Sequence, residues 1–326
     1  MSSALEQALE DARRKYTNWG RWGDEDALGT LNFIDPEKRA AAAALARAGR
    51  AFSLAQEFNR DGPQDALRGR GGTVHTMTES GLDAAADVQG HPHGFGSADG
   101  VVFMPLQSGT HWDGLGRVFD DGAAWNGRDC DEVVTGAGDR ITGIERQAAA
   151  FVGRGVLLDV GRVFGAIQHG AQGELPDGFA IKEEHLAGTI AAQGPGSAVG
   201  RGDIVLVRTG QLARCRRRGS WGGFAVGPAP GLSFAALDWL HRTEIAAAAT
   251  DTWDFEVRPY EFAEHCFSPL HQIAVPRMGL PLGELFDLEE LAADCARDRI
   301  YEFLLVAAPL PVTGAVAGPC NPIAVK

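Results

Sequence analysis

Lysine is scarce in this chain: there are four in 326 residues, and none of them follows a glycine. A phosphate-binding loop of the G-x-x-x-x-G-K-[ST] type is therefore excluded. The G-x-G-x-x-G fingerprint of dinucleotide-binding folds, the H-E-x-x-H zinc motif and the G-x-S-x-G of serine hydrolases are also missing. These absences argue against nucleotide chemistry and against serine hydrolysis.

Long apolar runs are missing as well. No segment approaches the ~18–20 consecutive apolar residues of a membrane span. The N-terminus carries Glu6, Glu10, Asp11 and Arg13 where a signal peptide would have an apolar core. The net charge of −13 disfavours binding to nucleic acid or to anionic membranes. We therefore expect neither of these as a partner.

Cysteines are few, odd in number and never spaced as C-x-x-C, which disfavours both a disulfide framework and a zinc knuckle. We predict reduced thiols in a cytoplasmic protein. The five cysteines are Cys130, Cys215, Cys266, Cys295 and Cys320.

Apolar runs alternate with helix-like segments along the chain, and this order is typical of a single α/β domain. Buried strands are predicted at 101–104, 156–160, 204–207, 245–250 and 303–306, and helices at 143–152, 183–193, 233–243 and 287–298. Asp35 and Pro36 predict the start of a further helix that ends before Gly49. A glycine-rich stretch at roughly 81–100 is predicted to be a loop that covers another part of the molecule or moves.

The segment after the first of these strands carries candidate metal ligands. If the strand continues, Gln107, His111 and Asp113 have the same parity and lie on one face of the sheet. An imidazole and a carboxylate two residues apart can bind one cation, and Gln107 can add an oxygen ligand. By itself His-x-Asp favours a hydrogen-bonded structural pair over a metal site.

The whole chain resembles the long subgroup of the cyclase family of metal-dependent hydrolases, which includes bacterial kynurenine formamidase and isatin hydrolase. The matching segments run nearly from end to end: 18–23, 28–32, 74–77, 107–113, 155–159, 202–210, 269–271 and 301–304, with Pro319, Asn321 and Pro322. The resemblance implies a central mixed β-barrel-like sheet flanked by helices. It also implies a homodimer or homotetramer, in which residues 1–34 form an N-terminal arm that reaches a neighbour, although packing within the chain suits that segment equally well.

The family's metal motif resembles H-x-x-x-H-x-D-x-x-x-H, followed much later by a His and a Glu. His111 and Asp113 match its centre, and His271 and Glu284 match the later ligands. Gln107 stands at the first His, where its carbonyl oxygen is a weaker ligand. The resemblance thus implies a divalent metal ion, Mn²⁺, Zn²⁺ or Fe²⁺, held by these residues.

Arg117 stands at the last His of the motif, which is a proton shuttle in relatives. Because a guanidinium stays protonated, Arg117 cannot take that role. It can instead bind a substrate carboxylate or an oxyanion, or pair with Asp120 or Asp121. Candidates for proton transfer are then Glu284, His75 and His93. The remaining histidines that we consider, His169, His185, His241 and His265, are predicted to be structural or exposed.

Three further residues are predicted to line the substrate pocket: Trp112, Asp251 and Trp253. Together with Trp125 they favour a flat, ring-containing small molecule, although core packing explains the tryptophans almost as well. The expected reaction is hydrolysis of an amide, cyclic amide or lactone. The alternatives are a non-catalytic metal- or ligand-binding relative and a metal-assisted cyclase or lyase.

Overall fold

The protein is described by a computed structural model that covers residues 4–64, 70–166, 173–262 and 267–326. Cys266, His169 and His265 lie outside the described residues. Cys130, Cys215, Cys295 and Cys320 all have free thiols. No helix in these four ranges is both long and apolar enough to cross a bilayer.

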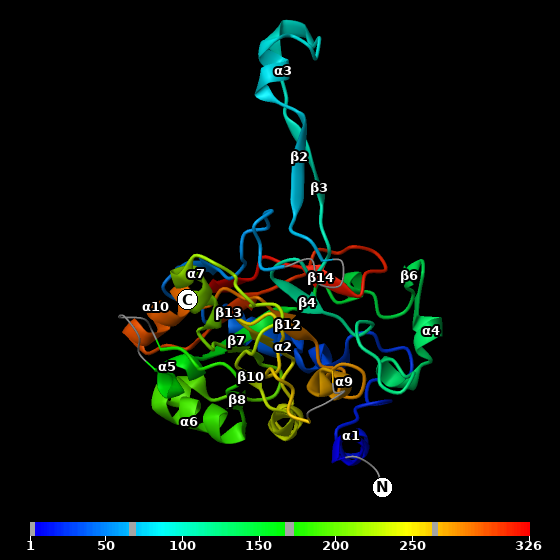
Figure 1. The fold of residues 1–326 in the computed structure, drawn as a ribbon, viewed down its shortest axis with the longest axis vertical. Coiled ribbons are helices and arrows are strands. Elements are labelled where there is room, and N and C mark those ends of the chain that lie inside the picture. The colour runs from blue at the N-terminus through cyan, green and yellow to red at the C-terminus, as the bar shows by residue number, and fades with distance from the viewer. Residues whose placement is uncertain (1–3, 65–69, 167–172, 263–266) are drawn as a thin grey trace.

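A mixed sheet of nine strands, curled into a half-barrel and flanked by helices, forms the body of the molecule (Figure 1). Its four central strands are parallel, and the strands on both sides run antiparallel to their neighbours. In spatial order they are β1 Ala51–Ser53, β15 Ile323–Val325, β13 Glu302–Val306, β7 Val152–Leu158, β9 Ile204–Val207, β11 Ala247–Thr250, β12 Leu282–Glu284, β4 His111–Asp113 and β14 Ala317–Pro319. The predicted fold class, an α/β domain with a barrel-like mixed sheet, is confirmed.

Both faces of this sheet are buried, as continuous apolar runs predict for central parallel strands. Along β9, Val205 and Val207 belong to one core cluster, while Ile204 and Leu206 belong to the other. The first cluster is completed by side chains of α1, α8 and α9, and the second by side chains of α10. The helices are α1 Ala4–Lys15, α2 Pro36–Ala43, α3 Gly81–Ala85, α4 Cys130–Val133, α5 Val160–Phe164, α6 Glu183–Gln193, α7 Gln211–Arg218, α8 Leu237–Arg242, α9 Pro269–Ala274 and α10 Glu289–Asp298.

Helix starts follow local capping chemistry. The Asp35 carboxylate accepts a hydrogen bond from the Lys38 backbone N–H at 2.7 Å, and Pro36 occupies the first turn of α2, as predicted. This helix ends at Ala43, six residues before Gly49. The helices expected near 183–193, 233–243 and 287–298 are present as α6, as α8 preceded by a short 3₁₀ turn, and as α10.

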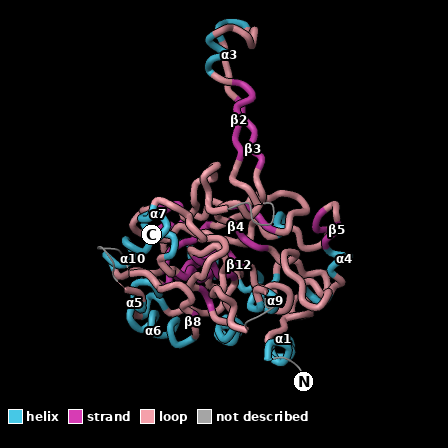
Figure 2. Tube along the Cα trace, viewed as in Figure 1, coloured by secondary structure: helices cyan, strands magenta, loops and turns pink. Residues whose placement is uncertain are grey.

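Two predicted elements are wrong. Residues 143–152 form only the 3₁₀ turn Ile144–Arg146, and β7 begins at Val152. The apolar run 101–104 is not a buried strand. It belongs to β3 Asp99–Phe103, which pairs with β2 Val74–Glu79 in a separate hairpin that stands away from the body (Figure 2). Residues 81–100 form most of its outer half.

The N-terminal segment packs against its own chain over the described residues. Leu9 and Ala12 of α1 are part of the first core cluster. The Trp19 indole donates a hydrogen bond to the Pro276 carbonyl at 2.7 Å, and its ring packs on Gly127. Of the two arrangements considered for residues 1–34, packing within the chain is the one that the structure has.

Candidate metal centre

Strand β4 presents the two residues of the His-x-Asp pair on one face. It lies between β12 and β14, antiparallel to both, and its register sets Glu284 of β12 opposite His111. Because side chains alternate across a strand, His111, Asp113 and Glu284 extend from the same side of the sheet. All three side chains are at least 90% buried.

Trp112 lies on the opposite face of β4, inside the second core cluster. Its ring stacks on Phe151 with a centroid distance of 4.6 Å, and its indole donates to the Ala307 carbonyl. Gly283 lies opposite Trp112, and a Cβ there would stand 2.8 Å from the indole ring. The prediction that Trp112 lines the pocket is therefore wrong, since its role is to fix β4 against the core.

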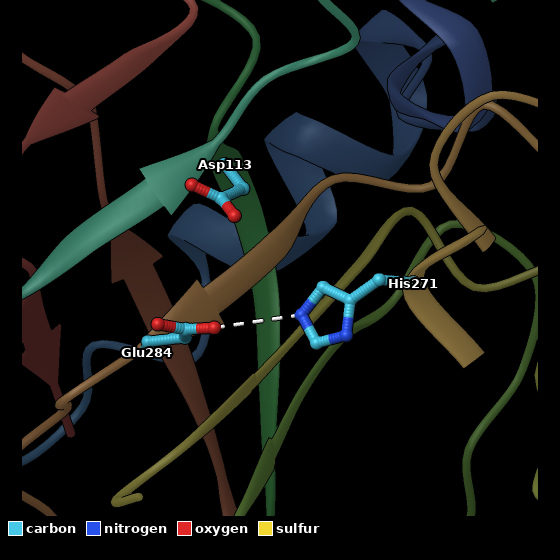
Figure 3. A group of neighbouring side chains, drawn as sticks. All are labelled: Asp113, His271 and Glu284. Carbon is cyan, nitrogen blue, oxygen red and sulfur yellow. Dashed lines mark ion pairs between the residues drawn. The ribbon is translucent and has the colours of Figure 1, made fainter. Parts of the chain in front are cut away.

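His271, from the buried helix α9, completes the group (Figure 3). Its Nε2 lies 3.4 Å from Oε1 of Glu284. One ligand atom each from Asp113, His271 and Glu284 fall within 4.8 Å of one another. Three segments distant in sequence thus bring their donor atoms to one point.

His111 adds a further donor beside this group. Its Nδ1 hydrogen-bonds to the Gly109 carbonyl at 2.8 Å, so the lone pair is on Nε2. That Nε2 lies 3.4 Å from Oδ1 of Asp113 and 3.6 Å from Oε2 of Glu284. Both Nε2 of His111 and Oδ1 of Asp113 are buried and make no hydrogen bond.

These contacts fit a divalent cation. Buried polar atoms without partners are costly, and a cation between them satisfies both. Donor atoms that surround an ion tetrahedrally at about 2.1 Å lie about 3.4 Å apart. The contacts from His111 to Asp113, from His111 to Glu284 and from His271 to Glu284, at 3.4, 3.6 and 3.4 Å, are close to this spacing. His111, Asp113, His271 and Glu284 are therefore the residues that can hold the ion.

Glu256 orients His271. Its Oε1 accepts from Nδ1 of His271 at 2.6 Å, and its carboxylate also accepts the backbone N–H groups of Leu270 and His271 in the first turn of α9. A carboxylate that binds the second nitrogen of a ligating histidine fixes its tautomer and ring orientation. Asp254, Glu256 and His271 form a second close group, which we interpret as this orienting contact because Nε2 of His271 faces the opposite way, toward Glu284.

The electrostatics are dominated by buried carboxylates. Burial would raise the pKa of Asp113, but the charge of Arg117 and the contact with His111 outweigh it and hold that pKa well below its usual range. Burial would lower the pKa of His271, yet the hydrogen bonds to Glu256 and Glu284 raise it well above its usual value. The raised pKa of His271 reflects the carboxylates around it, which also attract a cation, whereas the lowered pKa of Asp113 reflects the positive charge of Arg117 beside it.

A cavity of about 270 Å³ opens next to these donors. Asp113, His271 and Glu284 line it, together with Arg117, whose Nε lies 3.3 Å from Oδ1 of Asp113. The other lining residues are Arg70, Val118, Phe119, Trp253, Asp254, Phe267, Ser268 and Gln272. The cavity thus combines carboxylates, two guanidinium groups and aromatic rings.

Of the tryptophans considered for the pocket, Trp253 lines it. Its indole donates to Oε1 of Gln64 at 3.0 Å, and the Arg70 guanidinium lies 5.6 Å from its ring centroid. Trp125 is fully buried elsewhere. Asp251 does not line the cavity: its carboxylate accepts hydrogen bonds from Thr209 and Gly210, so it secures the loop after β9.

Gln107 and two histidines lie outside this group. Gln107 is in the turn between β3 and β4, where its carbonyl accepts from Nε2 of Gln64, and it does not line the cavity. The strand does not continue through this turn, so the expected shared parity with His111 and Asp113 is wrong for Gln107. His75 lies in β2 and His93 at the outer end of the hairpin, both exposed, so neither faces the cavity of its own chain.

Sequence reasoning missed Glu256 and Asp254. A sequence pattern could have indicated them. Asp254 and Glu256 stand two residues apart after the predicted strand 245–250, so both could face a site at the end of that strand. Arg117 was expected to pair with Asp120 or Asp121 if it took no part in the site. Asp120 instead binds Arg13, Gln272 and Arg277.

Comparisons with known proteins identify the family of this chain. The family model described as "Putative cyclase" matches residues 51–257. A crystal structure of a novel cyclase is 37% identical, with a TM-score of 0.84 over 96% of this chain and 99% of that chain. No curated protein matches the sequence.

Two isatin hydrolases share the fold at lower identity. Isatin hydrolase A from Labrenzia aggregata, bound to benzyl benzoate, is 17% identical with a TM-score of 0.58 over 90% of this chain and 100% of that chain. Isatin hydrolase A from Ralstonia solanacearum is 18% identical with a TM-score of 0.58 over 87% and 95%. The family model spans more than half of the chain and the 37% identical structure nearly all of it, so the chain belongs to the Putative cyclase family.

Proposed function

We propose that the chain is a metal-dependent hydrolase that opens an amide, cyclic amide or lactone bond in a small, ring-containing molecule. The observation that carries this proposal is the convergence of Asp113, His271 and Glu284 at the cavity, with His111 beside them. Nε2 of His111 and Oδ1 of Asp113 are buried there and make no hydrogen bond. A divalent ion held there, Mn²⁺, Zn²⁺ or Fe²⁺, supplies Lewis acidity toward a carbonyl and lowers the pKa of water.

Glu284 is our candidate for proton transfer. It lines the cavity and lies within 3.6 Å of both histidines. A carboxylate at this place can accept a proton from water and return it to the leaving nitrogen or oxygen. His75 and His93, the other candidates from the sequence, lie on the hairpin.

Arg117 is our candidate for binding negative charge. Its side chain is about three-quarters buried, its Nε makes no hydrogen bond, and Asp113 raises its already high pKa further. It therefore remains a fixed cation that can bind a substrate carboxylate or the oxyanion that develops at the attacked carbonyl. Trp253, Phe119 and Phe267 provide flat apolar surfaces that suit a ring.

Metal content tests the proposal first. Protein purified without chelator should contain near-stoichiometric manganese, zinc or iron by elemental analysis, and His111→Ala should lose most of it. His75→Ala is the matched control and should retain the metal, because His75 lies outside the cavity. A panel of aryl formamides, cyclic amides and lactones then tests turnover. Hydrolysis of a cyclic amide or lactone gives one product that is one water heavier than the substrate, and hydrolysis of an aryl formamide gives formate and the aryl amine. An unchanged product mass would indicate a cyclase or lyase instead.

One observation favours a second candidate, a binding protein without catalysis. Arg117 lies 3.3 Å from Oδ1 of Asp113, where its charge competes with a cation for that carboxylate. If the wild type takes up no metal after soaking with each ion while Arg117→His does, this second candidate is favoured over the hydrolase. Metal in the wild type without turnover of any member of the panel would favour a metal-binding protein.

A further inference from the structure

The cavity beside the metal centre carries two arginines on its wall. Arg70 comes from the segment before β2, and Arg117 comes from the segment after β4. Neither guanidinium helps to hold a metal ion, because a positive charge near the ion opposes its binding. Two arginines in so small a cavity instead indicate that it also binds an anion.

Arg117 shares its counter-charge with the metal centre. Among the described residues its one ion pair is with Asp113, where Nε lies 3.3 Å from Oδ1. That oxygen is also a ligand atom of the metal centre, so it cannot fully neutralise both an ion and Arg117. The Arg117 side chain is about three-quarters buried, and a buried charge without a counter-charge is costly. Filling the metal site therefore favours an anion next to Arg117.

The other two acids of the cavity are engaged elsewhere. Glu284 lies within 3.6 Å of both histidines of the metal centre. Oδ2 of Asp254 accepts a hydrogen bond from the Tyr260 hydroxyl at 2.5 Å, and its Oδ1 lies 3.7 Å from Nδ1 of His271. Both acids act on Arg117 only from a longer distance, since neither forms an ion pair with it in the described part of the chain.

Arg70 and Trp253 form a second part of the wall. The Arg70 guanidinium lies 5.6 Å from the centroid of the Trp253 ring. The indole is held by its hydrogen bond to Oε1 of Gln64, and the guanidinium of the buried Arg258 lies 5.4 Å from the same ring. A cation beside a fixed aromatic face suits a ring that carries a carboxylate, because the ring packs on the indole while the guanidinium binds the carboxylate.

The remaining wall and the volume limit the size of the ligand. Phe119 and Phe267 line the cavity, and their side chains are 37% and 54% exposed. The volume of about 270 Å³ is slightly below the range of about 300–1,000 Å³ that is usual for drug-sized ligands. A molecule of one or two rings fits this space, whereas a peptide or a nucleotide does not.

We propose that the substrate is an aromatic carboxylate, a molecule of one or two rings whose carboxylate is separate from the hydrolysed bond and binds to Arg70 and Arg117. This inference rests on the proposed hydrolase function and deepens it by naming the class of substrate. The carboxylate supplies the counter-charge that Arg117 loses when Asp113 binds the ion, and the ring packs on Trp253.

Binding of two matched probes tests the proposal without turnover. Benzoate and benzamide have the same number of non-hydrogen atoms and differ by one charge. In calorimetry on the full chain loaded with Zn²⁺, benzoate should bind at least about 10-fold more tightly than benzamide, as expected for a charge-assisted contact. Arg70→Gln and Arg117→Gln should each remove most of this preference. Arg140→Gln, an exposed arginine outside the cavity, is the matched control and should keep it.

Removing the ion tests the coupling through Asp113. In the metal-free chain Arg117 pairs with Asp113, so benzoate should bind about 10-fold more weakly than in the zinc-loaded chain. By linkage, benzoate should raise the affinity for zinc by the same factor. Arg117→Gln should lose this coupling. A coupling that survives in Arg117→Gln would show that benzoate coordinates the ion itself, and would overturn the assignment of the carboxylate to Arg117.

Turnover of matched substrates separates this inference from the proposed function. Formanilide and the 2-, 3- and 4-formamidobenzoates contain the same scissile bond, and only the formamidobenzoates carry a carboxylate. The best of the three should have a kcat/KM at least about 10-fold above that of formanilide in the wild type. Arg70→Gln should reduce this ratio toward one while leaving the turnover of formanilide largely intact.

Two sets of results tell the two proposals apart. If benzoate binds no more tightly than benzamide, undetectable binding of both included, or if formanilide is opened as readily as every formamidobenzoate, the substrate class is wrong and the hydrolase proposal stands. A clear preference for benzoate in a chain that opens no member of the panel would sink the hydrolase proposal, and the two arginines would then belong to a site for binding alone.

Discussion

The cavity and the projecting hairpin (residues 74–103) depart from the usual distribution of polarity in opposite directions. Beside the cavity, Nε2 of His111 and Oδ1 of Asp113 are polar and buried, and neither makes a hydrogen bond. On the hairpin, Phe103, Val102 and their neighbours are apolar and exposed. Both arrangements are unfavourable for the isolated chain. A bound cation would satisfy the buried polar atoms, and contact with another apolar surface would cover the exposed apolar side chains.

Removing a ligand should have the largest effect. Asp113→Ala should lower metal affinity by more than about 100-fold. Mutation of a residue that only hydrogen-bonds to a metal ligand already lowers affinity about 10–100-fold. Turnover of any substrate found in the panel should fall with it. Asp131→Ala, an exposed acid, is the control. Full turnover in Asp113→Ala would contradict both the metal centre and the hydrolase proposal.

Removing the charge that orients His271 should have a smaller effect. Glu256→Gln keeps the shape of the side chain but replaces the acceptor at 2.6 Å from Nδ1 by an amide. We expect metal affinity to fall about 10–100-fold, measured by competition with a chromogenic chelator. Glu132→Gln on the surface is the control. If Glu256→Gln bound metal as the wild type does, the orienting role would be wrong.

Asp120 can be compared with Asp113, because its carboxylate is also buried but is fully hydrogen-bonded within the chain. Burial raises its pKa, but hydrogen bonds from Arg13, Gln272 and Arg277 outweigh burial and lower it. An acid with a lowered pKa contributes stability above its unfolded pKa and loses that contribution as the pH falls through the folded value. Asp120→Asn should therefore lower the free energy of unfolding by about 1–3 kcal/mol at pH 7, and the difference should shrink below about pH 4.

Urea unfolding of both proteins across this pH range measures the effect, with Asp131→Asn as the exposed control. A difference that stayed constant with pH would show that the charge of Asp120 is not the cause.

The smallest effect is the concentration dependence of thermal unfolding. If the chain forms the homodimer that the resemblance implies and unfolding is coupled to dissociation, a tenfold rise in protein concentration stabilises the folded dimer by about 1.4 kcal/mol. The Tm of the wild type should then rise by about 1 °C per tenfold increase, as followed by circular dichroism. The Tm of a chain that lacks residues 75–102 should not depend on concentration. If the Tm of both proteins rose equally with concentration, the hairpin would not be needed for assembly.

The sequence predicted the central strands because their apolar runs are continuous. Parity along the strand placed His111 and Asp113 on one face, and the resemblance to the family identified them as metal ligands. The same parity places Trp112 on the opposite face, so its assignment to the pocket contradicted the argument used for its neighbours. Gln107 could not be placed, because the turn at 104–110 interrupts the alternation.

The run 101–104 was recognised as apolar but assigned to the core. Hydrophobicity alone does not distinguish side chains buried in the chain's own core from those exposed for another surface. The assignment of His75 to proton transfer at the site failed for the same reason. His75 lies in the hairpin because β2 pairs with β3, and no local sequence pattern shows that pairing.

Because the projecting hairpin buries none of its residues in its own chain, its sequence is released from the requirements of folding. Substitutions there are filtered only by what the hairpin touches. Among related chains, positions 78–103 should therefore diverge faster than the sheet. If the hairpin joins subunits, two diverged copies in one cell would thereby stop exchanging them while each kept its chemistry intact.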